Sequence, residues 1–507
     1  MDFERKSGIL LHPTSLPGAF GIGELGPEAR RFAGLLGDMG QGLWQVLPMG
    51  PTGYGDSPYQ SFSSFAGNHL LISFDQLAAD SLLNGSRLRD FPGFPGEHVE
   101  YGGIIPERMK ILRSVCRTFG RRASPDFNEG FRRFCLKQGY WLEDYALFIA
   151  LKEAHGGGSW IEWPEELIHR DPAALNKARR KYRTSIRYTK ILQYLFHRQW
   201  DSLKRHCNNL GVSIIGDIPI FVAHDSADVW ANPELFSLDY YGKPVAVAGV
   251  PPDYFSETGQ LWGNPTYRWD EHRRQNFAWW ISRMKKNLEM YDIIRIDHFR
   301  GFDACWEVPA GETTAVNGRW VDAPGDELFS ELIKKSGPLP IIAEDLGIIT
   351  HSVEKLRDGF NFPGMRVLQF SFGDRGSEGK YLPENCPSNC VVYTGTHDND
   401  TVVGWFHSEP GEGTTRTREE IVRERESILD CIGTDGSEIH WDLINLALQS
   451  NAVMSIIPMQ DLMGLGSKSR MNVPGRPSGN WKWRFTWDRI TPDIVERMRR
   501  MTQEAGR

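Results

Sequence analysis

The sequence has no long uninterrupted hydrophobic run, and no stretch approaches the roughly 20 apolar residues that a membrane-spanning helix needs. Its first residues carry charges of both signs with no apolar segment behind them, so we expect no secretory signal. Seven cysteines, an odd number spread over 507 residues, are typical of reduced thiols rather than of a disulfide framework. These absences predict a cytoplasmic protein with no membrane partner.

Clustered positive charge is also missing. The net charge is -7, and Lys and Arg are scattered along the chain. A nucleic-acid partner would require a concentrated positive face, so none is expected. Cys386 and Cys390 lie close together, but no second Cys or His pair nearby completes a zinc site, and we expect no metal. No repeat of about 20 to 50 residues is visible, which excludes a solenoid.

Aromatic side chains, in contrast, are plentiful. The chain has 17 Trp, and 12% of its residues are aromatic. Aromatic faces stack on sugar rings or on nucleobases, and the charge balance disfavours nucleobases. Most of these rings must pack in the core, but those that remain favour a carbohydrate ligand.

Eight short apolar runs along the chain predict the fold. The length of 507 residues allows one large barrel with insertions or two to three ordinary domains, and composition does not decide between them. The runs are separated by helical or inserted stretches, and several end in polar or acidic residues; they lie at 7–11, 43–47, 212–220, 291–297, 339–347, 365–370, 391–400 and 453–461. Eight parallel strands with polar tips on one face predict an α/β fold, a (β/α)₈ TIM barrel forming a single catalytic domain over 1–507.

Three segments interrupt this pattern. The stretch of approximately 75–211 is rich in Arg, Lys and helical spacing, which predicts a mostly helical insertion between the second and third strands. A long irregular stretch at 246–269 predicts a loop-rich insertion, extending over approximately 246–290, that covers the active site. The loop at 48–60 is dense in Gly, Pro, Ser and Asp, and its Tyr54 and Tyr59 are candidate sugar platforms or simple packing residues.

The run at 291–301 carries the strongest chemical signal. Ile294 and Ile296 face one side of the expected strand, while Arg295 and Asp297 face the other, toward the barrel interior and its mouth. Arg295 beside Asp297 would keep that carboxylate ionised at neutral pH, as a nucleophile requires. A buried structural ion pair explains the same pattern equally well.

Three acids, Asp297, Glu344 and Asp398, end three different strands and would converge at one mouth. Converging carboxylates suit either a divalent metal or the cleavage of a glycosidic bond. Arg295 would compete with a metal for Asp297, so the sugar chemistry is favoured. That chemistry needs one ionised and one protonated carboxyl, and crowding of like charges would raise the pKa of Glu344. The third acid and His397 would bind ring hydroxyls.

These motifs also carry a family resemblance. Arg295-Ile-Asp297, Ile342-Ala-Glu344-Asp-Leu-Gly347 and Thr396-His-Asp398-Asn399 resemble the catalytic motifs of the α-amylase-like retaining enzymes. Further segments of the sequence are similar to the 4-α-glucanotransferases known as amylomaltases or disproportionating enzymes, and they include Leu11–Gly18, Gly216–Val222 and Asp225–Trp230. The resemblance spans about 7–487. It implies a barrel with helical insertions, no β-sandwich domain after it, no cofactor, an α-1,4-glucan donor and a glucan or glucose acceptor.

Carried over position by position, the resemblance implies that Asp297 is the nucleophile, Glu344 the general acid/base and Asp398 the transition-state stabiliser. Trp262 resembles a residue of the loop that covers the bound glucan. Further sugar contacts are implied at Tyr59, Asp217, Arg295, His397 and Asn472. Retention requires that the carboxyls of Asp297 and Glu344 lie about 5 to 5.5 Å apart, which we predict here. A glucan hydrolase of the same barrel class, and a glucan-binding barrel without activity, are the alternatives.

Overall fold

The computed structural model describes residues 3–252, 256–372, 385–411 and 416–507. Its centre is an eight-stranded sheet in which every neighbouring pair is parallel. The strands are β1 (Lys6–Leu10), β2 (Leu43–Gln45), β3 (Ser213–Pro219), β6 (Ile293–Asp297), β9 (Ile341–Ala343), β10 (Gly364–Val367), β11 (Cys390–Tyr393) and β12 (Met454–Pro458). Their order is β10-β11-β12-β1-β2-β3-β6-β9, and a 2.9 Å hydrogen bond from Ala343 N to Pro363 O joins the two ends. The expected (β/α)₈ barrel is confirmed.

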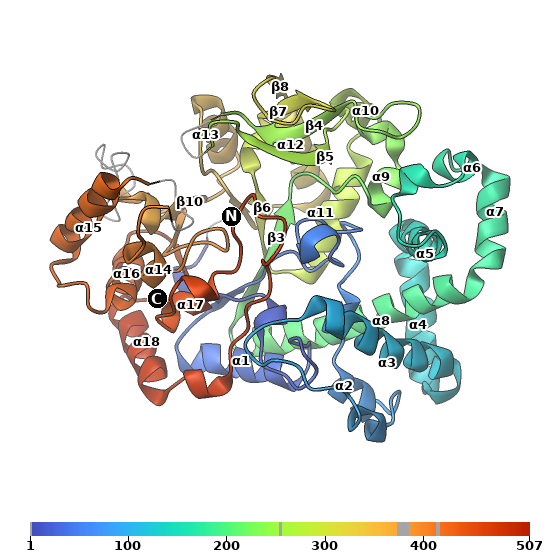
Figure 1. Ribbon diagram of the computed structural model, residues 1–507, viewed down its shortest axis with the longest axis horizontal. Helices are drawn as coiled ribbons and strands as arrows, with labels where there is room; N and C mark the ends of the chain where they lie inside the picture. Colours follow the sequence, from blue (N-terminus) through green and yellow to red (C-terminus); the bar gives the residue numbers. More distant parts are fainter. Residues whose placement is uncertain (1–2, 253–255, 373–384, 412–415) are drawn as a thin grey trace.

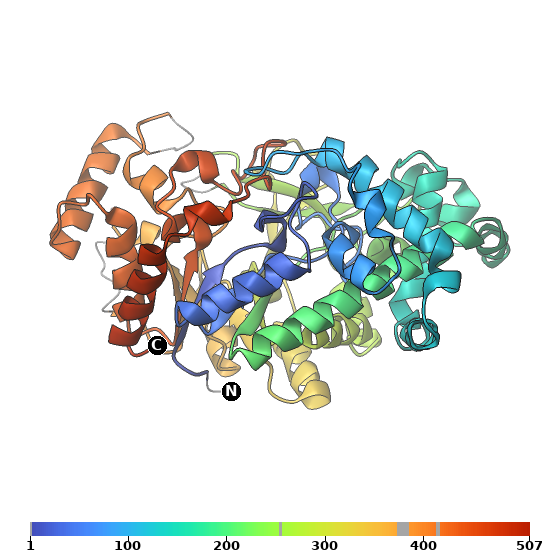
Figure 2. The same cartoon turned by 90° about the horizontal axis from the view of Figure 1, so that it is seen from below.

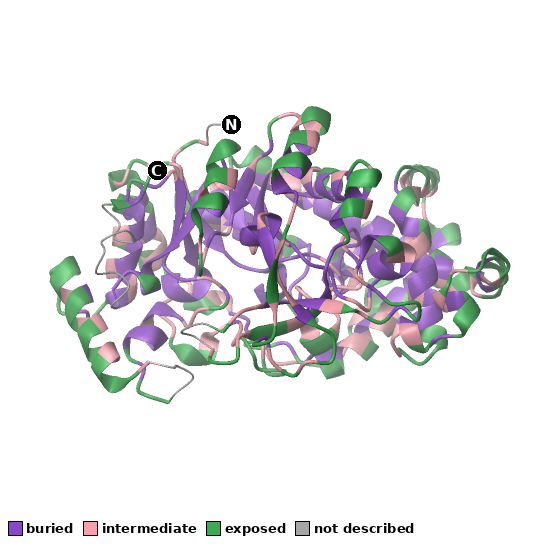
Figure 3. Cartoon of the chain, turned by 90° about the horizontal axis from the view of Figure 1, so that it is seen from above, coloured by how far each residue is buried: buried purple, intermediate pink, exposed green. Residues whose placement is uncertain are grey.

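Side-chain alternation along the strands separates two cores. One apolar cluster takes a residue from each of the eight strands and fills the barrel interior: Leu10, Leu43, Ile215, Ile293, Ile342, Met365, Val391 and Met454. Ile294 and Ile296 belong instead to the cluster that includes the buried residues of the surrounding helices. Because successive strand residues face opposite sides, Arg295 and Asp297 share the interior side with Ile293. The predicted orientation of this strand is confirmed, and Figure 3 shows the buried strands inside a shell of partly exposed helices.

Amphipathic helices pack on the outside of the barrel (Figure 1). α1 (Pro27–Asp38) begins with a proline in its first turn and buries residues at helical spacing, Ala29, Phe32, Ala33 and Leu36. The helices that precede the other strands include α8 (Arg183–Asn209), α11 (Ala278–Met290), α12 (Gly325–Ser336), α13 (His351–Gly359) and α16 (Ile439–Gln449), and α18 (Pro492–Glu504) follows the last one. Among the described residues, every helix is too short or too polar to cross a bilayer.

Seven helices lie between β2 and β3 and occupy one side of the barrel, opposite α15 (Arg418–Ile432) and α18 (Figure 2). Besides α8 they are α2 (Phe74–Ala79), α3 (Tyr101–Arg122), α4 (Pro125–Lys137), α5 (Gly139–Ala154), α6 (Glu165–Ile168) and α7 (Pro172–Lys181). Within this group α4 and α5 meet at Gln138. α8 leads directly into β3, so it belongs both to this helical group and to the barrel wall.

The stretch at 246–269 is not the irregular loop that the sequence predicted. It contains β4 (Ala246–Val250) and β5 (Gln260–Pro265), which join β7 (Ala304–Pro309) and β8 (Arg319–Asp322) in an antiparallel sheet ordered β5-β4-β7-β8. The remainder of 246–290 consists largely of α10 (Trp269–Arg274) and α11. Local composition missed the sheet because the central strand β4 pairs with β7, which follows β6 in the chain. Residues 253–255 of the predicted loop lie outside the described part of the chain.

Several of the predicted strand runs extend past the ends of their strands, and two of them continue directly into a helix. Residues Leu368–Phe370 form a 3₁₀ helix, and Met459–Leu462 form the short helix α17. In both places the chain turns away from the barrel as soon as it leaves the sheet, as βα-loops at the mouth of such a barrel do.

Candidate active site

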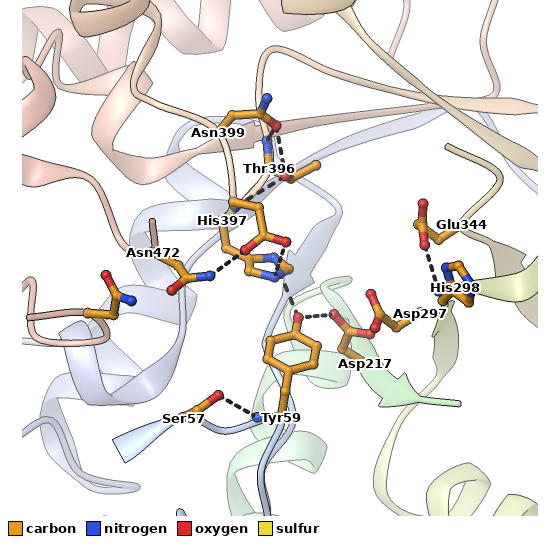
Figure 4. Close-up of polar contacts among 12 residues, drawn as sticks. Ser57, Tyr59, Asp217, Asp297, His298, Glu344, Thr396, His397, Asn399 and Asn472 are labelled. Atoms are coloured by element: carbon orange, nitrogen blue, oxygen red, sulfur yellow. Dashed lines mark hydrogen bonds and ion pairs between the residues drawn. The ribbon is translucent and has the colours of Figure 1, made fainter. Parts of the chain in front are cut away.

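The carboxyl ends of four barrel strands bring the predicted polar residues together. Asp217 lies within β3, Asp297 ends β6, Glu344 follows β9, and His397 lies in the loop after β11. Figure 4 shows these four side chains gathered in one region at this end of the barrel, with Tyr59 from the loop after β2 beside them. β3, β6 and β9 are neighbours in the sheet, so Asp217, Asp297 and Glu344 come from adjacent strands.

Arg295 is the centre of a buried charge network. Its Nη1 donates to Asp217 Oδ2 at 2.7 Å and to Asp297 Oδ1 at 3.0 Å, while Arg295 and Asp217 are only 4% and 2% exposed. Burial raises the pKa of Asp217, although Arg295 opposes that rise. Burial by itself would lower the pKa of Arg295, but Asp217 and Asp297 outweigh burial and hold it well above its usual value. The guanidinium therefore stays charged, with Asp297 in direct contact.

Glu344 is held by backbone donors on both carboxyl oxygens. His298 N donates to Oε2 at 2.6 Å, and Leu346 N donates to Oε1 at 3.0 Å. Burial raises the pKa of Glu344 to about 7, Asp297 contributes to the rise, and Arg295 opposes it. The raised pKa agrees with the sequence expectation, but burial is a larger cause than the crowding of like charges. A carboxyl that titrates near neutrality can both donate and accept a proton.

His298 connects Asp297 to Glu344 and to the second sheet. Its backbone is left-handed, with φ 51° and ψ 51°, an unusual conformation outside glycine that directs its N–H at Glu344. Burial lowers the pKa of its imidazole to about 4, so the ring is neutral at pH 7. The Trp262 ring meets it edge to face at 4.8 Å, and this places Trp262 over the end of β6. Sequence reasoning missed His298, whose only signal was its position beside Asp297.

Tyr59 joins the buried network to the third acid. Its hydroxyl donates to Asp217 Oδ2 at 2.8 Å, and its ring stacks on His397 with centroids 4.9 Å apart and planes 16° from parallel. His397 Nε2 lies 3.4 Å from Asp398 Oδ2. Burial raises the pKa of Tyr59 well above its usual value, so its hydroxyl keeps its proton. Four predicted site residues thus form one connected group.

The loop after β12 fixes Asp398. Asn472 Nδ2 donates to Asp398 Oδ1 at 2.6 Å, and Asn472 N donates to His397 O at 3.2 Å. Arg470, which the sequence analysis did not single out, donates from Nη2 to the Asp398 backbone carbonyl at 2.6 Å. The Asp398 side chain remains 48% exposed, so its carboxylate is accessible from the mouth side.

Tyr54 lies apart from this group. It is 79% exposed in a short 3₁₀ turn, Tyr54–Asp56, in which Gly55 has a positive φ of 67°. Within the described residues it makes no hydrogen bond or ring contact with the other predicted site residues. Among all the residues that the structure describes, no three His, Cys, Asp or Glu side chains are arranged to hold a metal ion.

Comparison with known proteins relates this chain to a family. A family model described as 4-alpha-glucanotransferase matches residues 11–490. The 4-alpha-glucanotransferase of Thermus thermophilus is 50% identical over 511 residues, covering 100% of both chains, and that of a Synechocystis strain is 49% identical, covering 99% of this chain and 98% of the relative. The solved structure of an amylomaltase from Streptococcus agalactiae in complex with acarbose superimposes with a TM-score of 0.94 at 39% identity, covering 99% of this chain and 100% of that one. The chain belongs to the 4-alpha-glucanotransferase family.

Proposed function

We propose that this protein performs the 4-α-glucanotransferase reaction of its family through Asp297, Glu344 and Asp398, acting as nucleophile, general acid/base and transition-state stabiliser. The observation that carries the assignment is the contrast between two neighbouring carboxyls. Asp297 contacts a guanidinium that stays charged, while burial raises the pKa of Glu344 to about 7. A carboxylate beside a fixed cation, next to a carboxyl that titrates near neutrality, is the pair that a retaining glycoside mechanism requires.

In the first step, Glu344 protonates the glycosidic oxygen of an α-1,4-glucan donor. Asp297 attacks the anomeric carbon, the glycosidic bond breaks, and a β-linked glycosyl-enzyme forms. Arg295 donates a hydrogen bond to the attacking carboxylate and orients it, and the two backbone N–H groups of His298 and Leu346 hold Glu344 in place. Asp398 and His397, joined to Asn472 and Tyr59, contact ring hydroxyls and stabilise the positive charge that develops on the sugar.

In the second step, the 4-hydroxyl of another glucan or of glucose replaces the leaving group. Glu344, now ionised, takes the proton from that hydroxyl as its oxygen attacks the anomeric carbon and displaces Asp297. Two inversions restore the α-1,4 link. Transfer dominates hydrolysis only if sugar outcompetes water for the intermediate, and the Trp262 ring over the β6 end supports such shielding. The separation of about 5 to 5.5 Å between the carboxyls of Asp297 and Glu344 stays a prediction.

Incubation with maltotriose tests substrate and reaction type together. Transfer gives a ladder of shorter and longer maltooligosaccharides with little gain in reducing ends. A steady gain in reducing ends would identify a hydrolase and contradict the proposal. Asp297→Asn, nearly isosteric, should abolish product formation while maltotriose still binds, and unchanged activity in this variant would remove Asp297 from the mechanism.

A further inference from the structure

The antiparallel sheet places a tryptophan from each of its two edge strands against the segment that follows Asp297. Trp262 on β5 meets His298, as described above, and on β8 the Trp320 ring lies over Arg300, with 3.7 Å between the guanidinium carbon and the ring centroid. Figure 1 shows this sheet beside the end of β6. Both edges of the sheet therefore place an aromatic ring on the segment that follows β6.

Arg300 is fixed to the Glu344 side of the mouth. The segments 298–300 and 344–348 run together and are joined by three hydrogen bonds: His298 N to Glu344 Oε2, Phe299 N to Glu344 O at 3.1 Å, and Arg300 Nη1 to Ile348 O. Arg300 is 7% exposed, so its guanidinium is a rigid base beneath the ring. It lies three residues after Asp297, which limits the distance between their Cα atoms to about 11 Å.

Trp320 is only partly covered by its neighbours. Arg300 occupies one face, and Trp306 on the adjacent strand packs against it with centroids 5.2 Å apart and planes 65° from parallel. The residue is still 38% exposed, and Ile348, whose carbonyl binds the same guanidinium, is 50% exposed. An exposed indole on a fixed cationic base is a platform of the kind on which a sugar face stacks.

The position of this platform relative to the acids decides what it would bind. Tyr59, His397 and Asp398 form one group with Asp217, and Figure 4 shows Glu344 apart from Tyr59 and His397. Glu344 contacts the oxygen that joins the donor to its leaving group or acceptor, so residues beyond Glu344 face the acceptor. Trp320 lies on the acceptor side, because its ring rests on Arg300 and Arg300 binds the Ile348 carbonyl.

We propose that Trp320, with Ile348, is an acceptor-side platform that stacks on a glucose unit of a glucan acceptor a few units from the bond being made. This inference rests on the proposed function.

The test uses α-maltosyl fluoride as donor, because fluoride places no sugar on the acceptor side. The C1–F bond breaks as Asp297 bonds to C1, and fluoride leaves. The 4-hydroxyl of the acceptor then bonds to C1, Asp297 departs as a carboxylate, and the hydroxyl proton passes to Glu344. Trp320→Ala should leave fluoride release without acceptor and KM for glucose unchanged, while KM for maltotetraose rises about three- to tenfold. Trp320→Phe, which keeps an aromatic face, should restore most of the affinity for maltotetraose.

The outcomes separate a binding role from a structural one. If the ring merely fastens the sheet to Arg300, KM for glucose and maltotetraose will change together and the unfolding midpoint will fall, and the inference is overturned. No change for either acceptor overturns it as well. Tyr241→Ala, which truncates a 63% exposed ring elsewhere on the surface, is the matched control and should change neither KM. If the wild type transfers to no acceptor, the proposed function fails, and calorimetric binding of maltotetraose to wild type and Trp320→Ala then decides the platform by itself.

Discussion

Arg295 shows why this strand carries two charges that a buried strand would ordinarily lack. Its Nη1 satisfies Asp217 and Asp297 at once, so no ion of the trio is buried alone. Removing the guanidinium would leave Asp217 buried without a countercharge, a change that typically costs about 3–5 kcal/mol. The sequence left two interpretations of Arg295 and Asp297 open, a structural ion pair and an activated carboxylate. The ion pair is present and has Asp217 as a second buried partner of the same guanidinium, while the activated carboxylate stays a proposal.

Glu344 allows a prediction about pH. The first step needs this carboxyl protonated, and with a pKa of about 7 it loses its proton as the pH rises through neutrality. We expect kcat/KM for a maltooligosaccharide donor to fall on the alkaline side with a midpoint near pH 7, and Glu344→Gln to lose about 10²–10⁴-fold in rate and to lose this limb. Initial rates measured from pH 5 to 9 would check both results.

The control for this prediction is the donor itself. Fluoride leaves without protonation, so the alkaline fall should be much weaker with α-maltosyl fluoride than with maltotriose. An alkaline fall of equal depth with both donors would assign the titration to another group and remove the evidence for Glu344 as the acid.

At the scale of elements, β3 packs so closely against Tyr291 that position 216 has no room for a side chain. A Cβ added to Gly216 would lie 2.2 Å from the ring of Tyr291, which leads into β6. The adjacent residue is Asp217, so any shift of β3 here moves the buried partner of Arg295. We expect Gly216→Ala to destabilise the protein by about 1–3 kcal/mol and to lower activity as well. Urea unfolding followed by tryptophan fluorescence would measure the change.

Gly34 in α1 is the matched control, because a Cβ there meets no heavy atom within 4 Å. Gly34→Ala should leave activity unchanged and raise stability by about 0.5–1 kcal/mol, as expected for removal of a mid-helix glycine. Equal stability of the two variants would show that β3 accommodates the methyl group without strain, contrary to the prediction.

The elements also show what the sequence could predict and what it could not. The barrel strands were predictable because successive residues such as Ile293 and Ile294 face different apolar cores, so that each strand leaves a short continuous apolar run. Asp297, Glu344 and Asp398 were predictable because each ends or follows an apolar run. The second sheet was not predictable from the sequence. Its strand β4 pairs with β7, which comes after β6 in the chain, and Pro251 and Gly259 between its strands are residues typical of a loop. The exposure of Tyr54 depends on the backbone of its turn, which composition does not specify.

On the scale of the whole molecule, the barrel strands carry the acids and the second sheet places aromatic rings beside the end of β6. The buried pairs Asp217–Arg295 and Tyr59–Asp217 are made by the strands and the loop after β2. Trp262 belongs instead to an edge strand of the second sheet, and its ring contacts His298 after β6 and Phe221 after β3. A retaining barrel alone would deliver its intermediate to water. The choice between transfer and hydrolysis should therefore depend on this added sheet.

Trp262→Ala tests that dependence. Truncating the ring removes the cover over His298 and admits water beside the anomeric carbon, so the ratio of hydrolysis to transfer from maltotriose should rise several-fold. The measurement compares the gain in reducing ends, which transfer does not produce, with the yield of longer oligosaccharides. Tyr241→Ala should leave the ratio at the wild-type value, because its ring is 63% exposed and packs on Tyr240. If hydrolysis and transfer by Trp262→Ala fall in the same proportion, the ring contributes to sugar binding or stability. Other residues would then determine whether sugar or water attacks the intermediate.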